Sequence, residues 1–439
     1  MYQNHRARYL ELLAQEGAAA LIPTGSLKTR NHDCEYRFRP ESDFWWLTGF
    51  AEPEAYLVLT PGSKHGDSHL FLQEKDREKE TWTGIRLGSE AAPSALGVDH
   101  AYDVSQMWQK LPELLAGQRR IVYRYGLDEA RDRRVHQLES DLVSRARSGL
   151  AAPAEWVAPW PNLHELRLKK SEDELAAMRR AADITAEAHV AAMGETAPGK
   201  NEAEIEALVD YCFRRRGSTG AAYNSIVAGG ANACVLHYIE NNQALSDGEL
   251  LLIDAGAEWQ YYAADVTRTF PIGGQFNAEQ RALYELVLAA QKASIDAVRP
   301  GRTFIEAHDV SVRVLTEGMI DLGLLSGGVE EAIESGSYRQ FYMHKTGHWL
   351  GLDVHDCGAY HLEGEWRALE PGMVTTIEPG LYVAPDDESV DARWRGIGVR
   401  IEDDILVTEH GNENLTSAVP KEIDEVEAAC RQTSLVSVG

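Results

Sequence analysis

Two aspartates follow one another closely in the sequence, in an arrangement that suits metal binding or acid–base chemistry. The apolar run Glu249–Asp254 ends in Asp254, and Asp265 follows after ten intervening residues, within Tyr261–Phe270. A hairpin of this length is expected to place the aspartates on facing strands with their carboxylates close together. Two buried carboxylates repel each other and are costly to desolvate. The pair alone leaves three readings open: a metal site, one exposed aspartate, or neutralisation of both by Arg268.

A second cluster carries imidazole chemistry. The segment HKTGHWLGLDVHD, residues 344–356, packs three histidines and two aspartates into thirteen residues. Glycines at positions 347 and 351 permit close approach of the backbone. Taken singly, a buried histidine is more often a hydrogen-bonded core residue than a ligand.

Two glutamates complete the set of candidate ligands. Glu378 follows the apolar segment Met373–Glu378 and is terminated by a Pro-Gly pair. Further along, Arg400 and Glu402 alternate with apolar neighbours, which predicts that both charged side chains lie on one face of a strand.

In their order these motifs resemble the pita-bread metallopeptidases, whose five metal ligands occur as Asp, Asp, His, Glu and Glu. The segments GHWLGLDVHD, TIEPGLY and GVRIED and the spacing of the two aspartates all agree with that pattern. The resemblance implies five ligands: Asp254, Asp265, His348, Glu378 and Glu402. It also implies two ions bridged by Asp265 and Glu402, with Asp254 mainly on one ion and His348 and Glu378 on the other. Four carboxylates and two divalent cations balance in charge.

The ligand types and the resemblance together indicate a metal and a mechanism. Oxygen ligands with a single imidazole favour Mn²⁺ over Zn²⁺, with Co²⁺, Zn²⁺ and Fe²⁺ left open. Two ions about 3.5–4 Å apart can hold a bridging water and lower its pKa, giving a hydroxide that attacks the scissile carbonyl. The resemblance implies that His237 and His355 contact the substrate or the oxyanion. It implies that His344 lies near the pocket for the residue after the cleaved bond, although Lys345-Thr346 replaces the Gly-Leu pair common in the family. Arg400 is expected to orient a ligand carboxylate.

Within this fold the chain resembles the aminopeptidase P family, which removes an N-terminal residue that precedes proline. The segments NHDCEYRFRPESDFWWLTGF (residues 31–50) and ETWTGIRLG (residues 80–88) carry that resemblance, so it covers nearly the whole chain. Methionine aminopeptidases lack such an N-terminal domain, and creatinase lacks the ligand set. The proline ring needs a shaped pocket. The resemblance assigns to it the aromatic residues Tyr223, Tyr360, Tyr382 and Trp82.

Two alternatives remain open. Prolidase, which cleaves Xaa-Pro dipeptides, shares the ligand pattern. A catalytically silent pita-bread protein that binds partners is the third reading, although such proteins typically lose ligands. The segment HLEGEWR, residues 361–367, stands where related enzymes carry a more basic loop. Its acids Glu363 and Glu365 predict a weaker preference for peptides with acidic residues after proline.

Helices and strands that must position these residues are visible in the sequence. Ser171 and Glu174 have capping-box spacing at the start of a helix, and Asn277 and Gln280 form a second such pair. Further helices are expected near 104–115, 202–213 and 305–322. Apolar segments predict strands at 18–22, 55–60, 68–72, 225–228, 249–255, 261–270, 373–378 and 398–407.

At 439 residues the chain exceeds what one core usually organises. We expect an N-terminal α/β domain over residues 1–165 and an α+β pita-bread catalytic domain over residues 171–439. The proline-rich segment 151–161 has neither a helical nor a strand period and is the expected connection.

Composition limits the partners and the compartment. The formal charge of −26 disfavours nucleic acid and anionic membranes. No apolar run is long enough to span a bilayer, and residues 1–17 lack the basic-then-apolar order of a signal peptide. Five scattered cysteines indicate reduced thiols and hence the cytoplasm. By analogy with the family we expect a homo-oligomer, a dimer or tetramer, in which Trp82 reaches a neighbouring subunit's active site.

Overall fold

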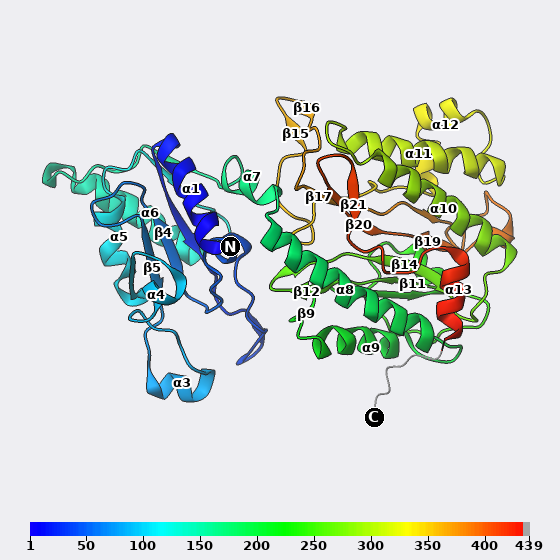
Figure 1. The fold of residues 1–439 in the computed structure, drawn as a ribbon, viewed down its shortest axis with the longest axis horizontal. Coiled ribbons are helices and arrows are strands. Elements are labelled where there is room, and N and C mark those ends of the chain that lie inside the picture. Colours follow the sequence, from blue (N-terminus) through cyan, green and yellow to red (C-terminus); the bar gives the residue numbers. More distant parts are fainter. Residues whose placement is uncertain (433–439) are drawn as a thin grey trace. The chain divides into compact units, whose positions relative to one another are not determined.

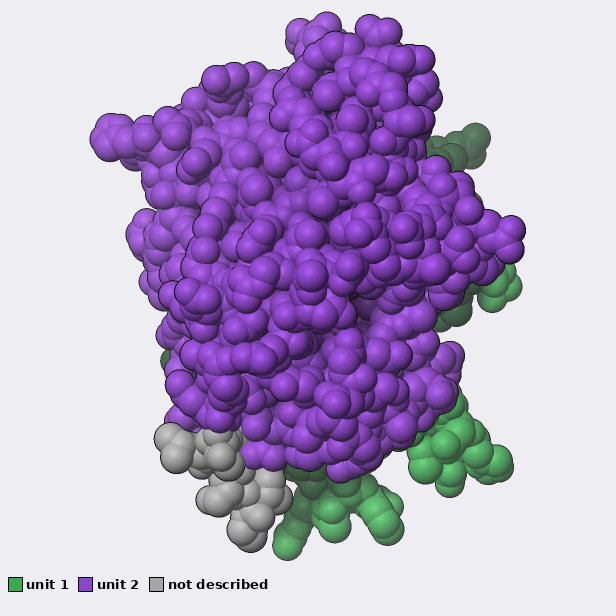
Figure 2. All heavy atoms as spheres, turned by 90° about the vertical axis from the view of Figure 1, so that its right-hand side faces the viewer, with its two compact units in different colours: residues 1–167 green, residues 168–439 purple. Residues whose placement is uncertain are grey.

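The computed structural model describes residues 1–432. The chain divides into two compact units, Met1–Arg167 (unit 1) and Leu168–Gly439 (unit 2), which are coloured separately in Figure 2. All five cysteines are free thiols. Among the described residues, no helix combines the length and the apolar character that a membrane span requires.

Unit 1 is built on a six-stranded mixed sheet with the order β6-β5-β4-β1-β7-β8. Antiparallel pairing joins β1 to β4 and β4 to β5. The pairs β5–β6, β1–β7 and β7–β8 are parallel. The strands are β1 (Ala18–Pro23), β4 (Tyr56–Leu59), β5 (Ser68–Leu72), β6 (His100–Asp103), β7 (Arg120–Val122) and β8 (Glu155–Val157). A separate hairpin consists of β2 (Thr29–Asn31) and β3 (Cys34–Glu35).

Helices α5 and α6 of unit 1 pack on this sheet through their apolar residues, whereas α3 has no buried residue. Leu111 of α5 and Leu138 of α6 pack with Leu21, Val58 and Phe71 in one core cluster. Each such buried side chain contributes about 1.5–3 kcal/mol. The helices are α1 (Tyr2–Glu16), α2 (Ser42–Thr48), α3 (Arg77–Thr83), α4 (Ala92–Leu96), α5 (Met107–Leu115), α6 (Glu129–Ser144) and α7 (Leu163–Leu168), the last ending at the start of unit 2.

In unit 2 the helices lie outside the strands, with α10 and α11 side by side on one side and α8 and α9 on the other (Figure 1). Both predicted capping boxes are confirmed, at Ser171–Glu174 for α8 and Asn277–Gln280 for α10. The helices are α8 (Glu172–Glu195), α9 (Glu202–Arg215), α10 (Ala278–Ala297), α11 (Phe304–Asp321), α12 (Val329–Ser335) and α13 (Ile423–Arg431).

The strands of unit 2 form several small antiparallel sheets. Their orders are β10-β11-β14, β17-β20-β21, β18-β19, β13-β12-β9 and β15-β16. Their bounds are β9 (Gly220–Ala221), β10 (Ile226–Gly229), β11 (Leu250–Asp254), β12 (Ala257–Trp259), β13 (Tyr262–Ala263), β14 (Thr267–Pro271), β15 (His361–Leu362), β16 (Glu365–Trp366), β17 (Val374–Ile377), β18 (Gly380–Tyr382), β19 (Gly398–Arg400), β20 (Asp403–Val407) and β21 (Asn412–Asn414).

Three sequence expectations are wrong in detail. The segment 151–161 contains a short strand, β8, that pairs with β7. The expected strands at 261–270 and 398–407 are each interrupted, giving β13 and β14 in the first case and β19 and β20 in the second. Both interruptions hold a candidate ligand, which a continuous strand would have placed on a regular pleat.

Candidate metal centre and active site

The two aspartates meet without occupying facing strand positions. Asp254 is the last residue of β11 and pairs with Thr267 of β14. Asp265 lies before β14 begins, in the break after β13. The expectation of a regular hairpin with both aspartates on facing strands is therefore wrong. Arg268 does not neutralise them either, because it points to Asp403, with Nη2 2.7 Å from Oδ1.

The two glutamates lie in the gap between two antiparallel strand pairs, β17–β20 and β18–β19. β17 pairs with β20 up to Ile377 and Asp403, and β18 pairs with β19 from Gly380 and Arg400. Continued through the gap, this antiparallel register sets Glu378 opposite Glu402. Glu402 thus lies outside the strand that was predicted to hold it together with Arg400.

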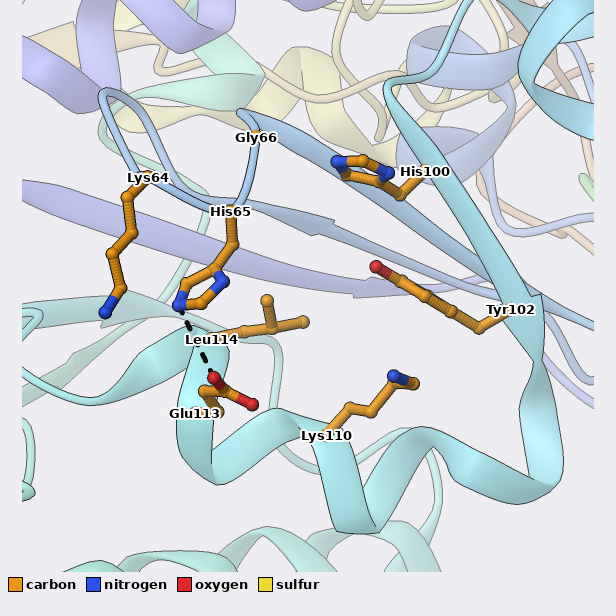
Figure 3. Close-up of a pocket in the computed structure, with 8 residues that line it drawn as sticks. All are labelled: Lys64, His65, Gly66, His100, Tyr102, Lys110, Glu113 and Leu114. Carbon is orange, nitrogen blue, oxygen red and sulfur yellow. Dashed lines mark ion pairs between the residues drawn. The ribbon is translucent and has the colours of Figure 1, made fainter.

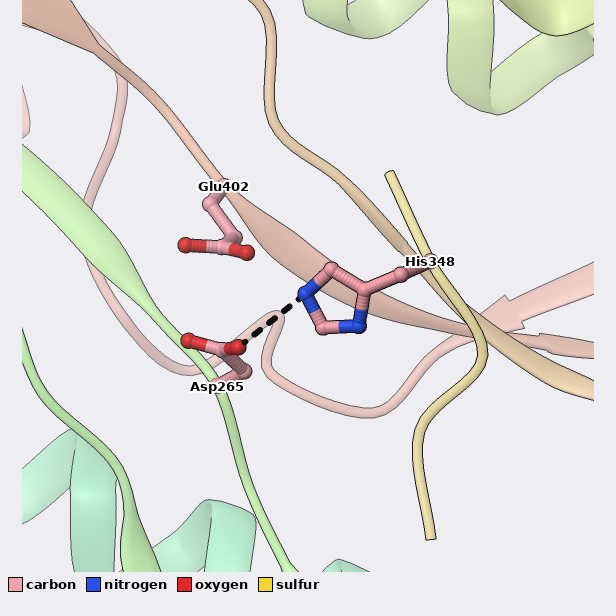
Figure 4. A group of neighbouring side chains, drawn as sticks. All are labelled: Asp265, His348 and Glu402. Carbon is pink, nitrogen blue, oxygen red and sulfur yellow. Dashed lines mark ion pairs between the residues drawn. The ribbon is translucent and has the colours of Figure 1, made fainter. Parts of the chain in front are cut away.

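His348 faces the carboxylates with a defined ring nitrogen (Figure 4). Its Nε2 lies 3.5 Å from Oδ2 of Asp265 and 3.4 Å from Oε1 of Glu378. Its Nδ1 lies 3.0 Å from the carbonyl oxygen of Trp349. A carbonyl can only accept, so Nδ1 carries a hydrogen, which leaves Nε2, the nitrogen that faces the carboxylates, as the one available to a metal ion. That tautomer is the one a metal-ligating histidine needs.

The cluster is electrostatically strained as a set of free side chains. Burial raises the pKa of Asp265, and the neighbouring Asp254 adds to the rise. Burial also raises the pKa of Glu402, with further repulsion from Asp265 and Glu378. The pKa of Glu378 rises to about 7 through burial, even though His348 opposes the shift. A neighbouring cation would favour the ionised form of each of these buried carboxyls.

Charged neighbours set the pKa values of two other groups in the cluster, His348 and Asp254. Burial alone would lower the pKa of His348, but its contacts with Asp265 and Glu378 raise it to about 9. For Asp254 burial works upward, yet the guanidinium of Arg400 outweighs it and lowers the pKa of the carboxyl.

Neighbouring polar side chains form hydrogen bonds to the candidate ligands. The hydroxyl of Tyr223 lies 2.5 Å from Oδ1 of Asp254 and 2.5 Å from Oδ1 of Asp265. Thr267 donates from Oγ1 to Oε2 of Glu402 at 2.6 Å, and Oγ1 of Thr267 accepts from Nε of Arg400 at 3.0 Å. The sequence analysis did not predict a role for Thr267. Strand alternation could have suggested one, because Thr267 points to the opposite face of the strand from its neighbour Arg268.

His344 belongs to this supporting network. Its Nδ1 lies 2.8 Å from the carbonyl oxygen of Lys345, so Nε2 accepts from the hydroxyl of Tyr382 at 2.9 Å. That hydroxyl in turn accepts from Nη1 of Arg400 at 3.1 Å. Burial lowers the pKa of His344 to about 4, and Arg400 adds to the effect. The imidazole is therefore neutral at physiological pH.

A cavity of about 380 Å³ opens onto the cluster. All five candidate ligands line it, as do His237, His355 and Tyr223. Its remaining walls come from residues that the sequence reading did not single out: Asn224, Ile226, Ile239 and Val354.

Five other residues predicted for the site, Arg400 among them, do not line this cavity. His344 and Tyr382 stand behind the ligands in the network with Arg400. Tyr360 stacks on Trp349, with ring centroids 5.0 Å apart, and accepts from its backbone N–H. Trp82 belongs to unit 1, where its side chain is 85% exposed.

The side chains present fit bound divalent metal. Single ligand atoms of Asp265, His348 and Glu402 lie within 4.8 Å of one another. The set combines carboxylate oxygens with one correctly oriented imidazole, a donor set typical of Mn²⁺ and other first-row ions. A bound cation would offset the raised pKa values of Asp265, Glu378 and Glu402.

A second cavity, of about 320 Å³, lies in unit 1 between the β4–β5 loop, β6 and α5 (Figure 3). Its basic groups are largely engaged: Nζ of Lys110 lies 4.3 Å from the centre of the Tyr102 ring, and Nε2 of His65 lies 3.6 Å from Oε1 of Glu113. None of the predicted site residues lines it.

Comparison with known proteins agrees with the geometry. Residues 176–409 match metallopeptidase family M24, and residues 2–123 match the aminopeptidase P N-terminal domain. Xaa-Pro aminopeptidase of Escherichia coli K12 is 46% identical over 428 residues, 97% of this chain and 96% of that protein. Pseudomonas aeruginosa aminopeptidase PepP superposes with a TM-score of 0.95 at 47% identity, covering 98% of each chain. A zinc-substituted E. coli aminopeptidase P in complex with product superposes with a TM-score of 0.94 at 44% identity, again over 98% of each chain. The chain belongs to the M24 metallopeptidases and, within them, to the Xaa-Pro aminopeptidase family.

Proposed function

We propose that this protein is a metalloaminopeptidase that hydrolyses the bond between an N-terminal residue and a following proline. The observation that carries the proposal is the convergence of all five ligands of the family's motif on one cavity, with His237 and His355 in its wall. Family membership supplies the substrate class, because the relatives with near-complete coverage are named Xaa-Pro aminopeptidases.

Two divalent ions would be held by Asp254, Asp265, His348, Glu378 and Glu402, with Mn²⁺ favoured by the oxygen-rich donors. Bound there, they supply a lowered water pKa and a Lewis acid for the scissile carbonyl. Asp265 and Glu402 serve as the shared ligands in this proposal. The zinc-substituted relative supports the capacity of such a site for more than one metal.

The side chains around the ligands have distinct tasks in the reaction. His237 and His355 contact the substrate and stabilise the oxyanion that forms at the carbonyl. Glu378 takes a proton from the attacking water and passes it to the leaving proline nitrogen. Arg400 holds Asp254 through the 2.7 Å contact of Nη2 with Oδ2. Tyr223 holds both aspartates, and Tyr382 and His344 hold Arg400.

The apolar wall of the cavity suits a proline ring and an apolar N-terminal side chain. Ile226, Ile239 and Val354 lie on it together with Tyr223. Tyr360, Tyr382 and Trp82 also contribute to the proline pocket in this proposal, Tyr360 and Tyr382 by supporting Trp349 and Arg400 and without lining the cavity.

Peptide hydrolysis tests the proposal directly. Purified protein reconstituted with Mn²⁺ should release the first residue from Xaa-Pro-Yaa tripeptides and longer peptides, and Glu402→Gln should not. Cleavage confined to Xaa-Pro dipeptides would identify a prolidase. Absence of both bound transition metal and peptidase activity would identify a silent scaffold.

We also propose a homo-oligomer, a dimer or tetramer, acting in the cytoplasm. Trp82 and Ile85 are 85% and 89% exposed, and such large apolar side chains favour a protein partner. The five free thiols suit a reducing compartment. Sedimentation of the wild type and of Trp82→Ala tests the assembly. A fully active wild-type monomer would contradict a shared site.

A further inference from the structure

One ion pair in unit 2 is buried completely and lies outside the ligand set. Nζ of Lys170 lies 3.0 Å from Oδ2 of Asp356, and each side chain is 1% exposed. Replacing such a pair with apolar residues often leaves a protein equally or more stable, so stability alone is a poor reason for its presence. A buried pair does, however, fix one conformation of the segments that it joins.

Asp356 fixes a short loop that enters the active-site cavity. Its backbone N–H donates to the carbonyl of Trp349 at 2.9 Å. Its Oδ1 accepts from the backbone N–H of Asp353 at 3.4 Å, which closes the loop upon itself. Between these points the loop presents Val354 and His355, and both line the cavity.

Lys170 ties the loop to a rigid part of unit 2. Its Nζ also donates to the carbonyl of Leu168 at 3.2 Å, and its backbone N–H donates to the carbonyl of Gly372 at 2.8 Å. Gly372 is bonded in turn to Val407, the last residue of β20. The backbone of Lys170 is therefore tied to the sheet that delivers Glu378 and Glu402, and its ammonium reaches Asp356 from there.

The chain makes room for this pair at Gly351. A Cβ at that position would collide with Oδ2 of Asp356 and would lie 2.9 Å from Cε of Lys170. Glycine thus allows the loop backbone to pass directly over the ion pair.

The result of this packing is a fixed His355. Its ring lies edge-on to the ring of His348, with centroids 4.3 Å apart and planes at 81°. Yet His355 itself is exposed, so its own side chain contributes little to holding it there. The neighbouring residue, Asp356, supplies the anchor.

We propose that Lys170 and Asp356 are positioning residues that hold the imidazole of His355 against the metal centre. This inference rests on the proposed function, in which His355 contacts the substrate. Displacing a reacting group by about 1 Å can cost about 100-fold in rate.

The test is a double-mutant cycle with His355. The variant Lys170→Met/Asp356→Asn removes both charges together, which avoids an unpaired buried charge. Its kcat should fall about 30- to 100-fold, with KM within about threefold and metal content unchanged. In a His355→Ala background the same two substitutions should lower kcat by less than about threefold, because their target is already gone. Lys170→Gln/Asp356→Asn, which also removes both charges but keeps polar side chains, serves as the second variant if the first does not fold.

The matched control is Lys169→Met, which removes the adjacent lysine. Lys169 pairs with Glu370 at a half-exposed position, with side chains 43% and 42% exposed, and should leave kcat within twofold. A further loss of tenfold or more in the His355→Ala background would overturn the proposal, as would a loss in proportion to lost metal.

A crystal structure of the zinc-loaded Lys170→Met/Asp356→Asn variant gives a readout that does not depend on activity. The ring of His355 should leave its position beside His348, and an unmoved ring would overturn the inference. If the wild type cleaves no Xaa-Pro peptide, the proposed function fails, but this crystallographic result still decides whether the ion pair positions His355.

Discussion

Arg400 and Asp254 form a buried, charge-assisted hydrogen bond, with Nη2 of the guanidinium 2.7 Å from Oδ2 of the carboxylate. The arginine side chain is 4% exposed and that of Asp254 is 13% exposed. The remaining nitrogens of Arg400 reach Thr267 and Tyr382. A single planar group therefore aligns one ligand, the threonine that supports a second ligand, and a tyrosine.

Arg400→Lys should impair the enzyme although it keeps the positive charge. An ammonium is a point charge and cannot make the three directed contacts of a guanidinium. We expect kcat/KM to fall about 10- to 100-fold, accompanied by weaker metal binding. Steady-state kinetics and metal analysis would measure both. Arg393→Lys, at an exposed position paired with Asp391, is the control, and equal losses in the two variants would contradict the proposed role.

Metal removal should make stability depend on pH. In the metal-free protein the pKa of Glu378 is raised to about 7 and that of His348 to about 9. The native state then binds more protons than the unfolded chain, so stability falls as pH rises. For Glu378 the loss develops between about pH 4.5 and pH 7 and is on the order of 3 kcal/mol. For His348 it develops between about pH 6.5 and pH 9.

Thermal unfolding of chelated and metal-loaded protein from pH 5 to pH 8.5 would measure this effect. The melting temperature of the chelated protein should decline with pH, and the gap to the loaded protein should widen. Glu378→Gln should make the decline shallower. A melting temperature of the chelated protein that rises or stays constant over this range would count against the scheme.

Tyr223→Phe separates a ligand-holding role from a substrate-pocket role. Loss of the hydroxyl leaves oxygens of Asp254 and Asp265 without the donor that lies 2.5 Å from each. We expect metal affinity to fall about tenfold, as for other groups that support metal ligands. Titration calorimetry with Mn²⁺ would measure it. Tyr238→Phe, whose hydroxyl bonds Glu202, is the control. A raised KM with unchanged metal affinity would assign Tyr223 to the substrate pocket alone.

The acidic hairpin formed by β15 and β16 should bias the enzyme toward basic peptides. Glu363 and Glu365 are exposed there, and Glu363 adopts a φ of 52° in the turn. At low ionic strength we expect kcat/KM for Xaa-Pro-Lys peptides to exceed that for Xaa-Pro-Asp peptides by about 3- to 10-fold. Added salt should reduce the difference, since exposed charges are screened.

The variant Glu363→Gln/Glu365→Gln should nearly equalise the two peptides. Glu334→Gln on α12, at another exposed position, should not. Equal rates on both peptides for the wild type would remove the basis of this prediction.

Much of the metal centre was visible in the sequence because its ligands stand in short motifs with fixed residue types. Asp254 at the end of an apolar run and Glu378 before Pro379 are both local signals. Capping boxes at Ser171 and Asn277 likewise depend on contacts three residues apart, and these were confirmed. Such features follow from local chemistry, which the sequence states directly.

The tertiary structure alone decided how the ligands meet. Asp265 and Glu402 lie in breaks between strands, because backbone contacts from other segments end the regular pairing there: the N–H of Glu402, for example, donates to the carbonyl of Thr267 at 3.1 Å. The orientation of His348 depends on a carbonyl in its own segment, but its partners Asp265 and Glu378 come from separate strands. The Lys170–Asp356 pair joins residues 186 positions apart. Contacts of this kind depend on packing between distant segments, so periodicity and spacing carry no record of them.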